Sequence, residues 1–177
     1  MKKIRLASLW LDGCSGCHMS FLDLDFELGE LIEQVEIVYS PIVDIKIYPE
    51  AVDAVLIEGA VSSESAIAEL QHIRERTGIL IAFGDCAVTA NVPGMRNPFP
   101  LAECLRRAYS ENADESSGNA IAALPPILSR VRPVHEVVKV DLFLPGCPPP
   151  TETIRQALAS LIGGQAFFPL ASTRFGA

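Results

Sequence analysis

The sequence predicts an α/β fold in which helices cover both faces of a parallel sheet, and three observations support this fold class. Short apolar segments typical of strands alternate with segments whose apolar residues recur at helical spacing. Several strand segments are continuously apolar, as strands buried on both faces are. The most continuously apolar of these segments end at turns that contain glycine. With 177 residues, 49% of them hydrophobic, and no internal repeat, residues 1–177 are expected to form one domain.

The elements are expected in alternating order along the chain. The first strand stops at Asp12-Gly13, and the apolar spacing from Phe21 onwards predicts the first helix. Ser62 or Ser63 is suited to cap the second helix, which Thr77-Gly78 ends. Strands are expected over 4–11, 35–39, 54–57, 79–83 and 137–144, and helices over 21–34, 63–77, 101–105 and 151–161.

Between residues 111 and 126 the sequence becomes polar, small and proline-bearing, which predicts an exposed insertion. The net charge of −8, without a block of Lys or Arg, argues against binding to nucleic acid or to an anionic membrane. No run approaches the roughly 18 apolar residues of a transmembrane helix. The basic start of the chain leads into an apolar stretch that Asp12 interrupts, so a signal peptide is not expected. We therefore expect a cytoplasmic location.

Four of the five cysteines lie in glycine-marked turns near the ends of expected strands. Cys14 and Cys17 share the segment CSGC, Cys86 lies in GDC, and Cys147 opens GCPPP. Ligands of open α/β sheets bind beyond the carboxyl ends of the strands. If the strands are parallel, the three turns bring all four thiols to one edge of the sheet. Cys104, within a helical segment, is expected to be a small buried apolar side chain.

Thiols from distant loops that meet at one edge are most simply explained by a shared metal centre, because structural disulfides are rare in the cytoplasm. Structural zinc sites usually combine two chelating pairs. One pair and two lone cysteines instead favour an iron–sulfur cluster, and Cys147-Pro148 is similar to the Cys-Pro ending of ferredoxin motifs. The alternatives are a zinc-stabilised structural module, a redox disulfide and unrelated buried thiols.

The ordered set CSGC, GDC and PGCPPP, with the EGA turn at 58–60, resembles the small subunit of NiFe hydrogenases. The resemblance extends from Leu6 to about Leu161 and implies a flavodoxin-like, doubly wound parallel sheet. By this resemblance, Cys14, Cys17, Cys86 and Cys147 bind one proximal 4Fe–4S cluster. The implied activity is electron transfer, with hydrogen split in a partner chain, because no acid–base constellation and no nickel-type double CxxC set is recognised here.

Two departures from the family pattern refine the expectation. The chain has no cysteine-rich C-terminal extension for further clusters, so it resembles the single-cluster subunit of cytoplasmic, NAD-reducing hydrogenases. The implied partners are a NiFe-containing large subunit and diaphorase-type iron–sulfur and flavin subunits, with FMN as a candidate second cofactor. Met19 stands where many uptake enzymes have a glutamate, so a proton route through that glutamate does not carry over. The rival is the small subunit of a complex I-like, quinone-linked enzyme, whose signature begins with two adjacent cysteines.

A few further side chains are candidates beside the cluster. Glu58 ends an apolar strand, where an unpaired carboxylate is costly, so it is expected to have a partner near the cluster or the subunit interface. His18 is either a tuning or proton-relay group or an imidazole facing solvent or an interface. Trp10 and Phe21 are expected to pack in the core or an interface, or to wall the cluster loop. The two other histidines, His72 and His135, are expected on solvated surfaces.

Overall fold

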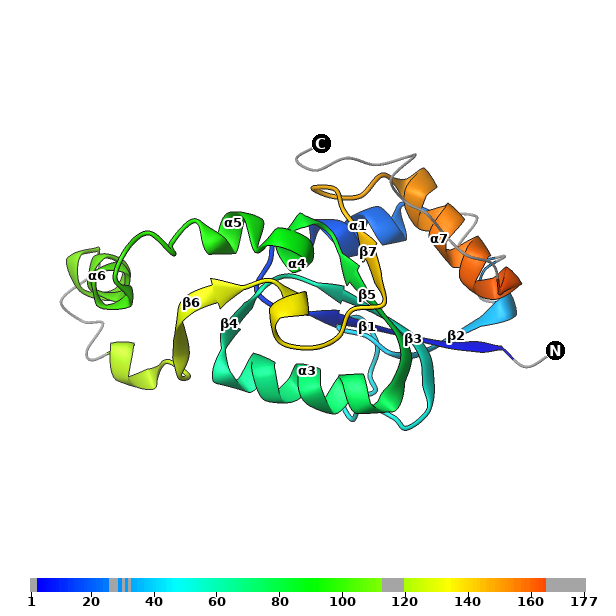
Figure 1. The fold of residues 1–177 in the computed structure, drawn as a ribbon, viewed down its shortest axis with the longest axis horizontal. Coiled ribbons are helices and arrows are strands. Elements are labelled where there is room, and N and C mark those ends of the chain that lie inside the picture. Colours follow the sequence, from blue (N-terminus) through cyan, green and yellow to red (C-terminus); the bar gives the residue numbers. More distant parts are fainter. Residues whose placement is uncertain (1–2, 26–28, 30, 32, 113–119, 165–177) are drawn as a thin grey trace.

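The computed structural model describes residues 3–25, 29, 31, 33–112 and 120–164, and at its centre lies a five-stranded sheet (Figure 1). All its strand pairs are parallel, and the strand order is β2-β1-β3-β5-β7. The order changes direction after β1, as in a flavodoxin-like, doubly wound sheet, so the expected fold class is confirmed. The strands are β1 (Ile4–Trp10), β2 (Val35–Tyr39), β3 (Val52–Glu58), β5 (Thr77–Phe83) and β7 (Leu142–Leu144).

Hydrophobic clusters cover both faces of the sheet. Because successive side chains of a strand point to opposite faces, Val55 of β3 belongs to one cluster and Leu56 to the other. Helices complete the clusters on each side, and Figure 1 shows them above and below the sheet. They are α3 (Glu64–Arg76) on the face of Val55, and α1 (Gly16–Leu22) and α7 (Thr151–Gly163) on the face of Leu56.

The ends of the two long helices agree with their end signals. The Ser63 side chain caps α3 by accepting the Ala66 N–H at 3.2 Å, and the helix ends at Arg76. Gly164, with a φ of 62°, follows the last residue of α7. The first helix differs from the expected range 21–34, because α1 already begins at Gly16, between the two cysteines of the pair, and ends at Leu22. The described residues 29, 31, 33 and 34 are helical, as expected. Leu28 and Ile32, which belonged to that pattern, lie outside the described residues.

The segment 137–144 is strand only over its last three residues, which corrects the expected boundary. The reason is visible at Asp141. Its backbone N–H donates to the Leu80 carbonyl at 2.9 Å, while its side chain accepts the Leu80 N–H at 2.9 Å. The carboxylate thus takes the place of a strand neighbour, and regular pairing begins at Leu142.

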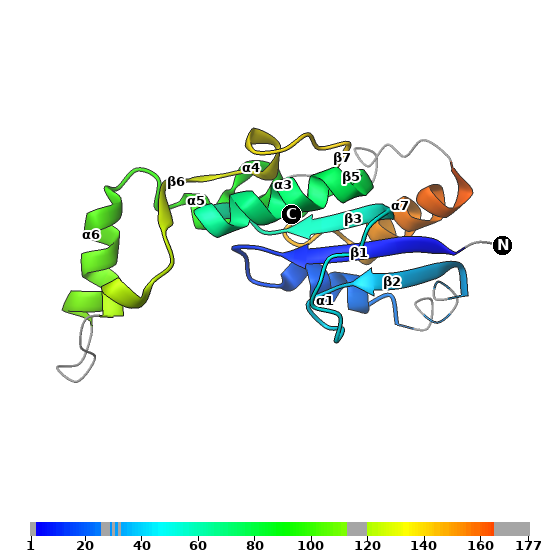
Figure 2. The ribbon, with the colours of Figure 1, turned by 90° about the horizontal axis from the view of Figure 1, so that it is seen from below.

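A second, two-stranded sheet was not expected from the sequence. It pairs β4 (Val61–Ser63) with β6 (Ile127–Arg132) in antiparallel fashion. In both views, the chain around α6 and β6 reaches away from the main sheet (Figures 1 and 2). The expected insertion over 111–126 is described only in part, because 113–119 lie outside the described residues. The remaining elements are α4 (Asp85–Thr89), α5 (Asn91–Gly94), α6 (Leu101–Arg106), η1 (Arg107–Glu111), η3 (Ala120–Ala123) and η4 (Val134–Glu136).

In the parts of the chain that are described, no helix is both long and apolar enough to cross a bilayer.

Candidate metal centre

The four cysteines in glycine-marked turns meet beyond the carboxyl ends of the parallel strands. Cys14 follows β1, Cys86 lies in the first turn of α4 after β5, and Cys147 follows β7. Cys17 lies in the first turn of α1. All four are free thiols; Cys17 is buried, Cys86 half-buried, and the other two exposed. The topology therefore brings together the side chains that the sequence argument placed at one edge.

These thiols border two adjoining cavities. The larger cavity, of about 320 Å³, is lined by Cys14, Cys86 and Cys147 together with residues such as Val92. The smaller cavity, of about 70 Å³, is lined by the same three thiols and by Cys17. Among the described residues, no three Cys, His, Asp or Glu side chains converge as the ligands of a single ion do. The four thiols instead surround a space.

Glycine is required at two turns of this site. Gly84 has a φ of 85°, and a Cβ placed on it would overlap Cys17 Sγ. Gly146 has a φ of 135°, and its Cβ would lie 2.5 Å from Pro149 Cα. The backbone also approaches sulfur at the cysteine pair, where the Gly16 N–H donates to Cys14 Sγ at 3.4 Å. Glycine at 84 thus leaves room for the Cys17 thiol, and glycine at 146 allows the tight turn that carries Cys147.

Asp85 joins two of the cysteine turns, a role that the sequence argument did not identify. Its carboxylate accepts the Gly146 N–H at 2.7 Å, and its own N–H donates to the Gly146 carbonyl at 2.9 Å. The Gly84 N–H donates to the Leu144 carbonyl at 2.8 Å. Cys86 and Cys147 are thereby held by one hydrogen-bonded unit. An aspartate directly before a cysteine in a glycine-marked turn is the sequence signal that could have pointed to this role.

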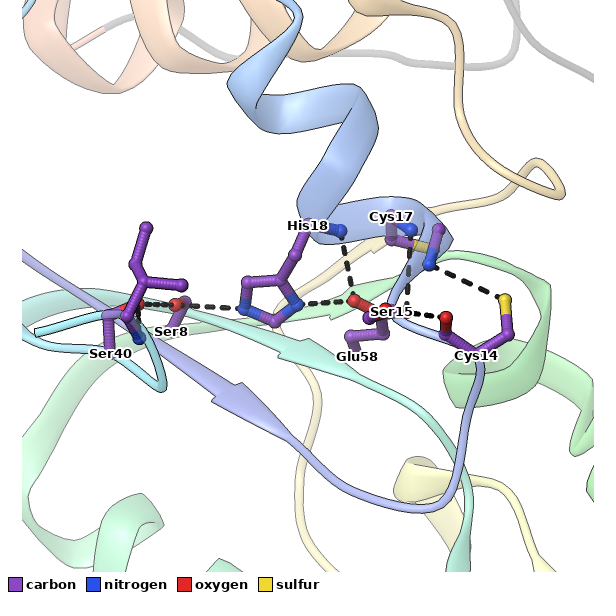
Figure 3. A network of polar contacts seen from close by, with 9 residues as sticks. Ser8, Cys14, Ser15, Cys17, His18, Ser40 and Glu58 are labelled. Atoms are coloured by element: carbon purple, nitrogen blue, oxygen red, sulfur yellow. Dashed lines mark hydrogen bonds and ion pairs between the residues drawn. The ribbon is translucent and has the colours of Figure 1, made fainter.

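Glu58 lies at the end of β3 and is 1% exposed. Its carboxyl oxygens accept the N–H groups of Cys17 at 3.3 Å and of His18 at 2.9 Å, and one of them also contacts His18 Nδ1 (Figure 3). The expectation that this buried carboxyl group has partners is confirmed. The carboxyl group thus fixes the first turn of α1, which carries Cys17, to the central strand of the sheet.

The protein environment makes two of the thiols hard to ionise. Burial raises the pKa of Cys17 far above its ordinary range, and the charges of Glu58 and of the other three thiols add to the effect. Burial also raises the pKa of Cys86, against the backbone hydrogen bond with Val92. Because thiolates and not thiols bind metals, a metal centre bound at this site would displace the protons of the Cys17 and Cys86 thiols. Sulfur donors of this kind suit iron–sulfur clusters and zinc.

The other candidate side chains lie away from the thiols or differ from expectation. His18 is buried and not exposed to solvent, which corrects one of its two interpretations. Phe21 belongs to the core cluster on the face of Leu56, whereas Trp10 is 48% exposed, and neither lines the thiol cavities. His72 and His135 are exposed, as expected, and Cys104 lies half-buried in α6, apart from the other four.

The family model described as NADH ubiquinone oxidoreductase, 20 Kd subunit, matches residues 14–161. The four cysteines and every described strand except β1 lie within this match, and the chain belongs to this family of oxidoreductase subunits.

Its relatives include hydrogenase subunits. The chain is 44% identical over 170 residues to the NAD-reducing hydrogenase HoxS subunit delta of Cupriavidus necator, and the match covers 93% of this chain and 81% of that protein. It is 38% identical to a subunit of the F420-non-reducing hydrogenase vhu of Methanocaldococcus jannaschii, over 92% of this chain but only 57% of that protein. Among solved structures, a chain of an NAD+-reducing [NiFe]-hydrogenase in the H2-reduced state matches with a TM-score of 0.91 and 37% identity, covering 98% and 99% of the two chains.

Proposed function

We propose that Cys14, Cys17, Cys86 and Cys147 hold one 4Fe–4S cluster and that the chain is the electron-transfer small subunit of a NiFe hydrogenase. The observation that carries the proposal is the convergence of four free thiols from three loops around a shared space. The donor set fits the group, because such clusters are held by four cysteine thiolates. A structural zinc site gathers four ligands around one ion, whereas no three donor side chains among the described residues converge in that way.

The cluster, when bound, would supply one-electron oxidation and reduction between the NiFe centre of a partner and further carriers that lead to NAD. The chain's own residues have structural tasks in this arrangement. Gly84 leaves room for the Cys17 thiol, Gly146 allows the close turn into Pro149, and Asp85 joins the turns of Cys86 and Cys147. The Glu58 carboxyl group fixes the turn of Cys17. Hydrogen bonds and burial of this kind set the potential of a cluster.

The proposal assigns hydrogen cleavage to a NiFe-containing large subunit and NAD reduction to diaphorase-type subunits. The names of the relatives support this, since one is a subunit of an NAD-reducing hydrogenase. The surface beside the thiols supports a partner as well. Val92, Met95 and Phe99, in and after α5, are 60%, 71% and 59% exposed, and Val92 also lines the larger cavity. Exposed apolar side chains beside a redox centre are expected where a partner covers it.

The proposal is tested on the complex purified anaerobically with its native partners. We expect about four irons and four sulfides per copy of this chain in addition to those of the partner subunits, together with partner nickel. We also expect reduction of NAD by hydrogen. Zinc in place of iron in this chain would favour the structural-module alternative and overturn the proposal.

A quinone-linked enzyme is the second candidate, favoured by the family match to a subunit of NADH ubiquinone oxidoreductase. The electron acceptor distinguishes the two: a quinone-linked complex would reduce a quinone and contain no nickel. The spacing of Cys14 and Cys17 and the 44% identity to a hydrogenase subunit support the hydrogenase. FMN has no support in the comparisons and is left out of the proposal.

A further inference from the structure

A chain of hydrogen bonds leads from the end of β2 to the turn that carries Cys17 (Figure 3). The Ser8 hydroxyl donates to Ser40 Oγ at 2.9 Å, and Ser8 Oγ lies 3.0 Å from His18 Nε2. The opposite ring nitrogen, Nδ1, contacts Glu58 Oε2, which also accepts the His18 N–H. Each hydrogen bond joins residues of different elements, so the series of hydrogen bonds extends from the β2 edge of the sheet to β3.

The donors and acceptors of this series of hydrogen bonds determine whether Nε2 of the imidazole carries a hydrogen. A hydroxyl group has only one hydrogen, and that of Ser8 is donated to Ser40. The Ser8 oxygen therefore accepts from His18 Nε2, which carries a hydrogen. With Nε2 held by Ser8, the ring is turned so that Nδ1 faces the carboxyl group of Glu58. A hydrogen bond on one ring nitrogen often orients the other nitrogen toward its functional partner in this way.

Packing alone does not account for an imidazole at this position. His18 is 7% exposed and its ring meets Phe83 edge-on, with centroids 6.5 Å apart, so an apolar side chain could fill much of the same space. Both ring nitrogens nevertheless have polar partners. A buried polar group that is satisfied at both ends specifies an orientation, which an apolar group does not.

We infer that His18 is a positioning residue: held by Ser8 and Ser40, it orients the Glu58 carboxyl group on the Cys17 turn and thereby sets the reduction potential of the bound cluster. The inference rests on the proposed 4Fe–4S site. Glu58 engages the Cys17 N–H and lines the same cavity as all four thiols. When the carboxyl group loses the hydrogen bond that it shares with His18 Nδ1, its negative charge is less compensated. A less compensated negative charge beside a cluster favours the more oxidised state, so the potential falls.

Two substitutions separate the two ends of the imidazole. The side-chain amide of Asn reaches about as far as Nδ1, so His18→Asn retains a donor beside Glu58 and loses the contact with Ser8. The amide of Gln reaches about as far as Nε2, so His18→Gln retains the contact with Ser8 and loses the hydrogen bond with Glu58. Both variants remove the ring from Phe83, so they match in lost packing.

The test is a redox titration of the assembled complex, followed by electron paramagnetic resonance of the reduced cluster, with iron content measured on the same samples. For His18→Gln we expect a lower midpoint potential, by at least a tenfold change in the oxidised-to-reduced ratio, about 59 mV for one electron. For His18→Asn we expect less than half of that shift. Ser8→Ala, which removes only a hydroxyl group, is expected to shift the potential in the same direction as His18→Gln but less.

The outcomes distinguish this inference from the proposed function. A wild-type complex without a 4Fe–4S signal overturns the proposed function and the inference with it. A wild-type signal with equal potentials in the Asn and Gln variants overturns the inference alone. If neither His18 variant assembles, Ser8→Ala decides: an unchanged potential and an unchanged spectrum in that variant overturn the inference.

Discussion

Each cysteine of the proposed site is distinguished by its local surroundings. Cys14, Cys86 and Cys147 border both cavities, Cys17 borders only the smaller one, and Cys104 borders neither. A cluster that loses a thiolate has an iron exposed to water or to a weaker donor. These differences separate the expected effects of otherwise identical substitutions.

We therefore expect Cys86→Ser and Cys147→Ser to lose the normal 4Fe–4S content and the electron transfer that depends on it. Cys104→Ser is the matched control, because it makes the same chemical change in α6, and it should retain wild-type iron. Iron and sulfide assays combined with electron paramagnetic resonance check both. An intact cluster in Cys147→Ser, or a lost cluster in Cys104→Ser, would contradict the assignment.

Gly84 allows a second test that leaves every thiol in place. Its φ of 85° disfavours any L side chain, and a Cβ there would overlap Cys17 Sγ. We expect Gly84→Ala to lower iron content at least as strongly as a cysteine substitution. Gly164→Ala is a suitable control: its φ is 62°, but nothing lies within 4 Å of the added Cβ. It should bear the backbone strain and retain the cluster, and equal iron in the two variants would argue against crowding at Cys17.

At the scale of elements, the hydrogen bonds of Asp141 with Leu80 hold the short strand β7 against the sheet. The loop of Cys147, which follows β7, is positioned by the same contacts. Burial by itself raises the pKa of Asp141, but the Leu80 N–H, Arg74 and Lys139 outweigh it and hold the pKa below its ordinary value of 3.8. A carboxylate with a lowered pKa stabilises the fold above that ordinary value. Its contribution is lost as the pH falls through the folded-state pKa.

Asp141→Asn should therefore lower the free energy of unfolding at pH 7 by about 1–2 kcal/mol, since it weakens hydrogen bonds to a charged group. The difference between variant and wild type should shrink as the pH falls below 3.8. Urea denaturation of the chain without its cluster, followed by circular dichroism at several pH values, measures this. A difference that stays constant down to acidic pH would show that charge is not the cause.

The elements that the sequence predicted well are those with their own local signals. This group contains the apolar strands β3 and β5 and the capped helix α3. A continuous apolar run predicts a strand buried on both faces, and a serine before a helical pattern predicts a cap, so both signals lie in adjacent residues. By contrast, β6 was missed because its only partner in the described sheets is the three-residue β4. The pairing of these two short strands depends on the tertiary structure.

The candidate site divides in the same way. The four thiols could be brought together from the sequence, because parallel strands all point their carboxyl ends to one edge. The partnership of His18 with Glu58 could not be derived, since 40 residues separate them and the histidine was as compatible with an exposed position. Distances between side chains on different elements follow from packing, which local patterns do not encode.

At the scale of the whole molecule, the proposed division of labour places bond cleavage and electron relay in different chains. A Cys14→Ala complex that still assembles should lose hydrogen-dependent NAD reduction, because the relay is broken. It should retain hydrogen–deuterium exchange, which takes place at the partner's metal centre. Both activities are measured on the same preparation, with the wild-type complex as reference. Normal electron flow from hydrogen to NAD in this variant would refute the central functional proposal.

The wide spacing of the four cysteines along the chain has a consequence for how the protein is made. Cys14 and Cys17 leave the ribosome early, but Cys147 follows only after β7, more than a hundred residues of synthesis later. The proposed cluster site is complete only when that strand has joined the sheet, so insertion of the proposed cluster would be a late event in the synthesis of the protein. Until then Cys14 and Cys17 would be open to oxidation, so we expect assembly of the proposed site to require an environment that keeps them reduced.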